Sequence, residues 1–218
     1  MKSIKLSLVT VIIASTILAN EKPELNTSAN VAMTSNYVWR GMTQSDNSPA
    51  IQGGFDLDYN GAYIGAWGSN IDFGTDASME FDSYAGYTNK VFNISYDLGY
   101  IHYAYPNDTK GSNFGEAYIG LGYDFDILEV NAKASFGVET DDFNADDNYE
   151  AGISVPLPMK ISFNATVGNY VHTGAYYLVS ISKTFSKFDI SLAYTGMNYD
   201  QSNVDDEGNV VATISASF

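Results

Sequence analysis

The sequence contains no cysteine, two histidines and two tryptophans in 218 residues. The absence of cysteine excludes disulfide scaffolds, cysteine-ligated zinc, iron–sulfur clusters and thiol nucleophiles. Basic residues are also scarce, with 10 Lys+Arg against 26 Asp+Glu and a formal net charge of −16. Because such an acidic chain without a basic stripe repels a phosphate backbone, we do not expect nucleic acid as a partner.

Tyr, Phe and Gly are abundant, at 17, 12 and 19 residues. Hydrophobic residues make up 45% of the chain, which excludes the composition of a disordered protein. Tyr and Phe favour half-buried pleated surfaces, and Gly serves tight turns and crowded strands. The composition therefore indicates β structure.

The longest apolar run lies at the N-terminus. Lys2 and Lys5 precede a largely apolar, uncharged stretch at 6–18, and Ala19 offers a small residue for cleavage. The run is shorter than the ~20 residues that a membrane-spanning helix needs, which argues against a membrane anchor. We therefore predict a signal peptide at 1–19, a periplasmic N-terminal segment at 20–28 and a folded domain at 29–218.

Beyond about residue 28, apolar and polar residues alternate with a period of two. Phe92, Ile94 and Tyr96, for example, alternate with Asn93 and Ser95. This pattern predicts strands with one apolar face, and no helical period competes with it. The predicted strands are 29–40, 49–59, 62–70, 79–88, 91–105, 113–124, 127–138, 147–157, 160–171, 175–185, 188–199 and 209–218.

The connections between these strands alternate between tight turns and mostly longer polar loops. The tight turns are 60–61, 89–90, 124–126, 156–158 and 186–187, and Asn60-Gly61 is the strongest short hairpin signal among them. Five turns between six loops place both termini on the turn side. This is the layout of an even-stranded outer-membrane barrel, and the strands have the ~9–11 residues of a tilted membrane strand. We therefore predict an all-β fold, a transmembrane antiparallel up-and-down β-barrel of twelve strands in the bacterial outer membrane.

Aromatic residues near the strand ends suggest two interfacial belts. The predicted loop-side belt is Tyr37, Trp39, Tyr103, Tyr105, Tyr149, Tyr170 and Tyr199, and the turn-side belt is Tyr59, Tyr63, Phe92, Tyr123, Phe125, Phe185 and Phe188. A soluble sandwich or lipocalin-like barrel also alternates, but a twelve-stranded soluble barrel would have to bury every apolar face inside.

Four segments in register over the first strands carry a resemblance to a known family. They are NYVWRGMTQS at 36–45, PAIQGG at 49–54, GAYIGAWGSN at 61–70 and EFDSYAGY at 80–87. The ordered set resembles the TorF-type porins of Gram-negative bacteria, and the rest of the chain matches mainly in pattern. The resemblance implies an outer-membrane channel of undefined substrate. The last strand ends on Phe218, which resembles the signal that outer-membrane proteins present to the barrel-assembly machinery.

If the apolar face meets lipid, the opposite face lines a lumen. The predicted pore-lining charges are Arg40, Asp56, Asp58, Glu80, Asp82, Asp97, Glu116, Glu129, Lys133, Glu150 and Asp189. An acidic lining concentrates cations, so we predict passive diffusion of small hydrophilic solutes with a preference for cations. Arg40 facing Glu80 and Asp82 is a candidate constriction. The alternative is a plugged structural barrel, or an adhesin- or receptor-like one, in which ion pairs fill a narrow lumen.

No enzymatic activity and no cofactor are predicted. His102 shares the lipid-facing parity, but no serine on a neighbouring predicted strand stands out as its partner. His172 lies in a short loop, and two separated histidines do not make a metal site. The acidic loops around 141–142, 146–147 and 205–207 are solvated or hold divalent cations that bridge lipopolysaccharide. The expected partners are therefore outer-membrane lipid and lipopolysaccharide, the barrel-assembly machinery, and small hydrophilic solutes or cations.

Overall fold

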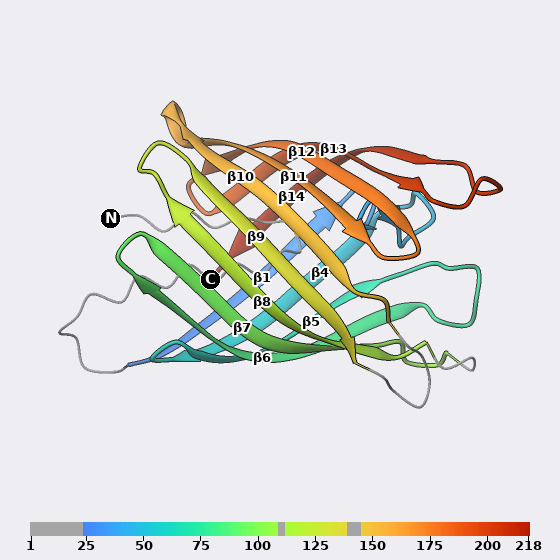
Figure 1. The fold of residues 1–218 in the computed structure, drawn as a ribbon, viewed down its shortest axis with the longest axis horizontal. Helices are drawn as coiled ribbons and strands as arrows, with labels where there is room; N and C mark the ends of the chain where they lie inside the picture. The colour runs from blue at the N-terminus through green and yellow to red at the C-terminus, as the bar shows by residue number, and fades with distance from the viewer. Residues whose placement is uncertain (1–23, 109–111, 139–144) are drawn as a thin grey trace.

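Twelve antiparallel strands pair in sequence order and close on themselves, as β1 pairs with both β4 and β14 (Figure 1). The computed structural model describes residues 24–108, 112–138 and 145–218. The barrel strands are β1 Leu25–Thr34, β4 Ala50–Tyr59, β5 Ala62–Asn70, β6 Met79–Val91, β7 Ile94–Ala104, β8 Phe114–Asp124, β9 Glu129–Val138, β10 Asn148–Leu157, β11 Ile161–Tyr170, β12 Gly174–Phe185, β13 Phe188–Tyr199 and β14 Glu207–Ser217. A small hairpin, β2 Val38–Trp39 and β3 Met42–Thr43, and a single-turn helix, η1 Pro158–Lys160, complete the elements. The predicted twelve-stranded fold is confirmed.

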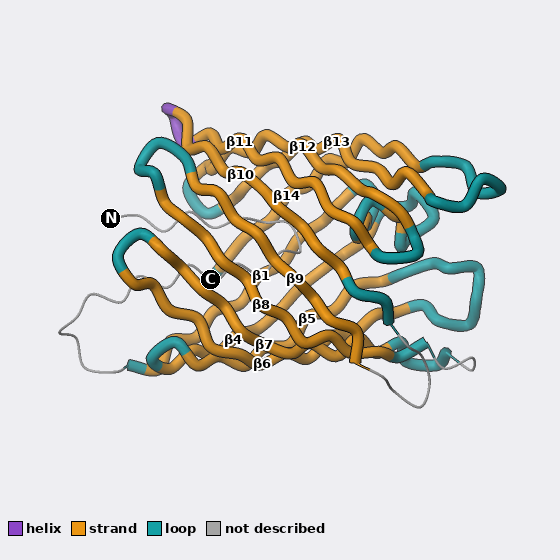
Figure 2. Tube along the Cα trace, in the orientation of Figure 1, coloured by secondary structure: helices purple, strands orange, loops and turns teal. Residues whose placement is uncertain are grey.

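The two ends of the barrel differ in their connections. Figure 2 shows short connections at one end, here called the turn end, and longer ones at the other, the loop end; the C-terminus lies at the turn end. Asn60 and Gly61 both adopt positive φ, as a two-residue hairpin with the right-handed twist of strands requires. The turn predicted at 89–90 lies at 92–93 instead, because β6 continues to Val91 and the β6–β7 ladder gains three further pairs, the last of them Val91 with Ile94.

The barrel is apolar outside and polar inside. Large hydrophobic side chains such as Phe55, Val167 and Leu192 are exposed on the outer face, whereas their neighbours along each strand point inward. A soluble barrel has the opposite arrangement, so the outer face is suited to lipid. The described residues include no helix that is long and apolar enough to cross a membrane.

The first strand differs from its prediction at both ends. It begins at Leu25 rather than at residue 29 and ends at Thr34 rather than at residue 40. Residues 35–49, which we call the inturned segment, then leave the wall and carry the β2–β3 hairpin. The reversal occurs at Arg40 and Gly41, both at positive φ (48° and 81°), which is the backbone of a tight two-residue turn. The alternation of side chains that predicts a strand continues to residue 40, but the turn at Arg40 and Gly41 reverses the chain and ends the strand prediction there.

The predicted loop-side aromatic belt is largely wrong. Hydrophobic clusters bury four of its members, Tyr37, Tyr103, Tyr105 and Tyr170, together with the partly buried Trp39. Tyr149, by contrast, is 47% exposed on the outer face. These rings pack around the inturned segment rather than against lipid. At the turn end, Tyr63 is also buried, whereas the other six predicted belt residues are exposed: Tyr59, Phe92, Tyr123, Phe125, Phe185 and Phe188.

Candidate functional site: the lumen and its loop-end mouth

The inturned segment fills the loop-end mouth of the barrel with aromatic side chains. Tyr37 is 2% exposed and packs edge-on against Trp67 of β5, with ring centroids 5.4 Å apart. Trp39 packs edge-on against Tyr103 of β7 at 5.9 Å and Tyr170 of β11 at 5.6 Å. Rings from three strands of the wall therefore contact the segment. Such edge-on contacts contribute stability beyond that of the buried apolar area.

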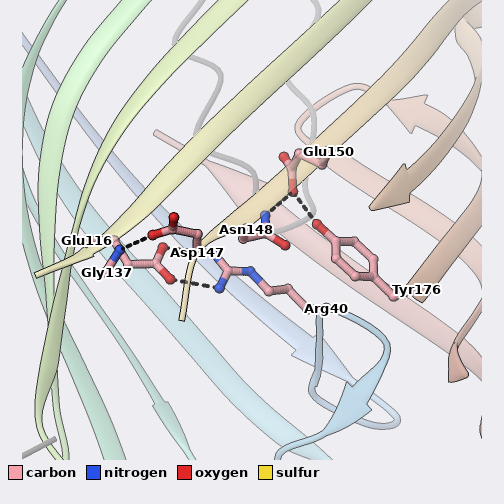
Figure 3. A network of polar contacts seen from close by, with 7 residues as sticks. All are labelled: Arg40, Glu116, Gly137, Asp147, Asn148, Glu150 and Tyr176. Carbon is pink, nitrogen blue, oxygen red and sulfur yellow. Dashed lines mark hydrogen bonds and ion pairs between the residues drawn. The ribbon is translucent and has the colours of Figure 1, made fainter. Parts of the chain in front are cut away.

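Arg40, at the tip of the hairpin, forms a forked ion pair with Glu116 of β8 (Figure 3). Both guanidinium nitrogens donate to the two carboxylate oxygens at 2.7 Å, and the side chains are 8% and 1% exposed. The guanidinium carbon lies 4.2 Å from the centre of the Trp39 ring and 4.8 Å from that of Tyr170. The charge is thus buried between two aromatic faces and one carboxylate.

Arg40 keeps its charge in this setting. Burial lowers the pKa of the guanidinium, but the Glu116 carboxylate opposes this and leaves the pKa of Arg40 above its ordinary value. The positive charge is therefore present throughout the neutral and mildly alkaline range.

Further hydrogen bonds tie the inturned segment to the wall. The backbone N–H of Thr43 donates to Oε2 of Glu207 on β14 at 2.9 Å. The Tyr37 hydroxyl donates to Oε1 of Glu80 on β6 at 3.2 Å. Together with Arg40, these contacts anchor the segment on opposite sides of the mouth. Glu207 was predicted to lie in an exterior loop, but β14 begins with it and turns it inward.

Glu80 and Asp82 lie beneath the inturned segment and are 2% and 1% exposed. One oxygen of each, Oε2 of Glu80 and Oδ1 of Asp82, is buried without a hydrogen-bond partner among the described residues. The sequence predicts that Arg40 faces this pair of carboxylates, whereas in the structure Arg40 forms its ion pair with Glu116. The reason is that Arg40 sits on a hairpin tip rather than on the wall, so strand parity does not locate it.

Tyrosine hydroxyls donate to the inward carboxylates along the lumen. Tyr63 donates to Asp97 at 2.7 Å, and Tyr84 donates to Asp56 at 2.5 Å. Tyr176 donates to Glu150 at 2.6 Å (Figure 3). Asp97, which appears isolated in the sequence, therefore has a hydrogen-bond donor. Such pairs reduce the cost of holding carboxylates in a narrow lumen.

Several inward tyrosine rings lie against a glycine on the neighbouring strand. The directly opposed pairs are Tyr63 with Gly86, Tyr84 with Gly65, Tyr118 with Gly99 and Tyr176 with Gly168. At each of these glycines, an added Cβ would lie within 2.5 Å of ring atoms. The rings therefore occupy the space that a side chain would need, and they narrow the lumen from within.

Lysines complete the inward charges. The ammonium of Lys133 on β9 lies 4.2 Å from the centre of the Tyr118 ring, and Lys133 stands opposite Glu150 in the β9–β10 register. Lys90 and Asp124 form an ion pair of 3.1 Å toward the turn end. The sequence reading missed this second pair because it ended β6 before Lys90 and treated Asp124 as part of a turn.

The remaining predicted lining residues lie in the turn-end half. Asp58, Glu129 and Asp189 have inward parity and are partly exposed, as are Asp56 and Asp97. This contrasts with the nearly complete burial of Glu80, Asp82 and Glu116 toward the loop end. These turn-end side chains are thus more accessible to solvent than the carboxylates beneath the inturned segment. Phe218 is 69% exposed and continues the β1–β14 ladder through two backbone hydrogen bonds with Ala29.

On the outer face, the register brings Ser83 of β6 directly opposite His102 of β7. The sequence reading missed this partner because it assigns faces but not register. The next residues across the sheet are Ala66 and Gly115, which offer no polar group to orient the imidazole. These two register partners therefore add no side-chain polar group to the Ser83–His102 pair.

Asp146, Asp147 and Asp206, which belong to the predicted acidic loops, make side-chain hydrogen bonds. Asp147 Oδ1 accepts from the Gly137 N–H at 3.2 Å (Figure 3), and His172 Nδ1 lies 3.0 Å from Asp146 Oδ1. Residues 141–142 lie outside the described ranges. Within those ranges, no three His, Asp or Glu side chains are grouped to hold a metal ion.

Comparisons with known proteins support the fold. A family model described as "Bacterial protein of unknown function (Gcw_chp)" matches residues 19–218. Among solved structures, the KdgM porin is similar with a TM-score of 0.64 and 11% identity, covering 88% of this chain and 99% of that one. The NanC porin follows at 0.56 and 10%, covering 88% and 99%. Outer membrane phospholipase A from Escherichia coli reaches 0.56 and 13%, covering 88% and 92%.

No curated protein sequence matches the chain. At these identities the structural likenesses show the fold alone, which porins and a phospholipase share. With its apolar exterior, the chain is a multi-pass β-barrel of the bacterial outer membrane.

Proposed function

The chain belongs to the Gcw_chp family of bacterial proteins of unknown function, and on this premise we propose that it is a porin-like channel. It passes small hydrophilic solutes by passive diffusion and prefers cations. The observation that carries the proposal is the polar, acidic lumen inside a closed apolar barrel. The proposed lining residues are Arg40, Asp56, Asp58, Glu80, Asp82, Asp97, Glu116, Glu129, Lys133, Glu150 and Asp189.

Electrostatics favour cations over acidic solutes in this lumen. The similar KdgM porin has also been solved in complex with disordered oligogalacturonate, a sugar that carries carboxylates. In the present chain, nine lining acids outnumber the two lining bases among the proposed residues. Fixed negative charge in a confined passage attracts cations and repels anions. We therefore propose small cations and neutral solutes rather than acidic saccharides.

A second candidate is a barrel that does not conduct and acts through its surface. The filled loop-end mouth favours it, because Arg40, Tyr37 and Glu116 are almost fully buried. Planar bilayers separate the two candidates. Discrete conductance steps, with a reversal potential of cationic sign in a KCl gradient, are expected for the channel. Absence of steps overturns the channel, and a reversal potential of anionic sign overturns only the cation preference.

Charge neutralisation in the turn-end lumen is expected to weaken cation preference. Asp56→Asn combined with Asp97→Asn removes two inward charges, while the amide oxygens still accept from Tyr84 and Tyr63. We expect the K⁺/Cl⁻ permeability ratio to fall about twofold or more. Asp200→Asn, on an exposed loop, is the control and should leave the ratio unchanged. An unchanged ratio in the double variant would place the ion path elsewhere.

Phe218 is proposed as the assembly signal at the end of β14. Replacing Phe218 with alanine is expected to lower the amount of folded barrel in outer membranes several-fold, because the apolar terminal ring is lost. Phe188→Ala is a matched control, since Phe188 is also exposed at the turn end of the outer face. The ratio of folded to unfolded bands on unheated gels measures the effect. Equal loss in both variants contradicts a specific role for Phe218.

We also propose a relationship to the TorF-type porins, based on the four segments between residues 36 and 87. Lipopolysaccharide and the barrel-assembly machinery are the proposed partners of the exterior. No enzymatic activity is proposed, and the register partners of Ser83 and His102 on β5 and β8 are the non-polar Ala66 and Gly115.

A further inference from the structure

The geometry points to a guanidinium-binding site on the inner wall, formed by Glu116 of β8 and Tyr170 of β11. In this structure the chain's own Arg40 fills the site and latches the inturned segment across the mouth. The inference rests on the proposed function and deepens it by assigning the channel a gate at its loop-end mouth. The existence of the latch, however, is testable without any measurement of transport.

The chemistry of the site is specific for a guanidinium. Two parallel hydrogen bonds of 2.7 Å match the planar fork of an arginine to both oxygens of Glu116. The ring of Tyr170 covers one face of the planar cation at 4.8 Å, and Trp39 accompanies it from the hairpin at 4.2 Å. An ammonium is a compact point charge that cannot form the fork, so a lysine does not substitute fully.

The Arg40–Glu116 ion pair is a buried, charge-assisted tie between the inturned segment and the wall. The described residues form three ion pairs, and Arg40–Glu116 is the buried one. The partners in the other two, Lys90–Asp124 and His172–Asp146, are substantially exposed. Other ties to the wall are the hydrogen bonds of Thr43 to Glu207, of Tyr37 to Glu80 and of Asn36 to Asn209, together with backbone and side-chain bonds of Ser35 to Ala212. Removing one partner of a buried pair leaves an uncompensated charge, which is strongly unfavourable. Loss of Arg40 therefore favours hydration of Glu116 and departure of the segment.

The latch also predicts how the site responds to a free solute. Because Arg40 is tethered beside its site, its effective concentration there is at least millimolar. A free guanidinium solute therefore competes poorly with Arg40 in the native chain. Once Arg40 is removed, the same solute should bind the vacated site on Glu116 and Tyr170. Rescue by a free guanidinium is thus the signature of this site.

A single introduced cysteine reports on the segment, since the chain has no cysteine of its own. Gln44 is 9% exposed, and its side chain donates only to carbonyls of its own segment, so Gln44→Cys leaves the wall contacts intact. The labelling rate with a water-soluble maleimide in detergent micelles is compared with and without Arg40→Ala. We expect labelling to rise about tenfold or more in the double variant. Arg40→Lys should give an intermediate rate.

Addition of methylguanidinium should slow labelling of the Gln44→Cys/Arg40→Ala variant several-fold, whereas methylammonium at equal concentration should not. A further change, Glu116→Gln, should abolish this protection. Unchanged labelling after Arg40→Ala, or equal protection by both cations, overturns the proposal. Gel migration of unheated samples verifies that each barrel is folded, and Glu116→Gln alone supplies a second route to an unlatched segment. Conductance in bilayers is scored separately, so failure of the channel and failure of the latch are distinguishable.

Discussion

Gly41→Val is expected to detach the β2–β3 hairpin from the barrel wall. A Cβ at this position would lie 2.2 Å from the carbonyl oxygen of Gly196 and 2.5 Å from its carbonyl carbon. These are backbone atoms of β13 that cannot rotate away. Gly41 also has φ of +81°, which a β-branched residue adopts only at considerable cost. The hairpin must therefore move away from β13, which pulls Arg40 from Glu116.

Limited proteolysis measures this change directly. Trypsin cleaves after arginine, and Arg40 is buried in the closed mouth, so the native chain should resist cleavage there. In Gly41→Val we expect the fragment ending at Arg40 to appear about tenfold faster or more, because proteolysis follows the population of the open form.

Gly74→Val is the matched control for Gly41→Val. Gly74 also has positive φ, at +66°, but no atom lies within 4 Å of its added Cβ. The control therefore carries the backbone strain without the collision. Resistance of the Arg40 site in Gly41→Val, or equal cleavage in both variants, contradicts the docking of the hairpin on β13.

Gly86→Val is expected to destabilise the whole barrel. Its Cβ would lie 2.3 Å from the hydroxyl oxygen of Tyr63 and 2.5 Å from the carbonyl oxygen of Leu98. Tyr63 is committed to Asp97 and Tyr118, so its ring cannot leave without breaking both contacts. Overpacking of this kind costs about 1–3 kcal/mol. Denaturant unfolding in detergent, followed by tryptophan fluorescence, provides the measurement.

Gly120→Val separates overpacking from the general cost of valine in the lumen. Gly120 also faces inward, but the nearest atom to its added Cβ is Cβ of Asp97 at 3.7 Å, an ordinary contact. We expect a clearly smaller change in unfolding free energy than for Gly86→Val. If the two variants unfold alike, the tyrosine over Gly86 does not determine the stability of this wall.

Strand number and facing were predictable from the sequence because both follow from alternation. Asp56, Glu116 and Lys133 have the inward parity that the pattern assigned to them. The same alternation places Tyr103 on the inward face with Asp97. The belt prediction set this aside because Tyr103 lies near a strand end, where interfacial aromatic residues are common. The pattern gives the face of the sheet, and only the register gives the partner across it. Ser83 and His102 illustrate the second point.

The mouth was not predictable, because it depends on a turn that interrupts a continuing alternation. Residues 35–40 keep the period of a strand, but Arg40 and Gly41 reverse the chain and send Tyr37 and Arg40 inward. The cost of leaving the ladder is balanced by contacts with β8, β11 and β14 that are remote in sequence. Such long-range compensation leaves no periodic signal. The Arg40-Gly41 pair was the available clue, since glycine is common in two-residue hairpins.

The departure of the chain after Thr34 leaves the barrel wall with a notch. β14 pairs with β13 from Glu207 to Ala216, but with β1 only from Thr213 to Ser217. One further backbone bond, from Ser35 N–H to the Ala212 carbonyl, closes the ladder on the β1 side. Beyond it, side chains of the inturned segment reach β14, as Asn36 does with Asn209. The inturned segment and the β1–β14 closure of the barrel therefore meet at the same residues, Thr34 to Asn36, so we expect a displacement of the segment to disturb the closure of the wall as well as the mouth.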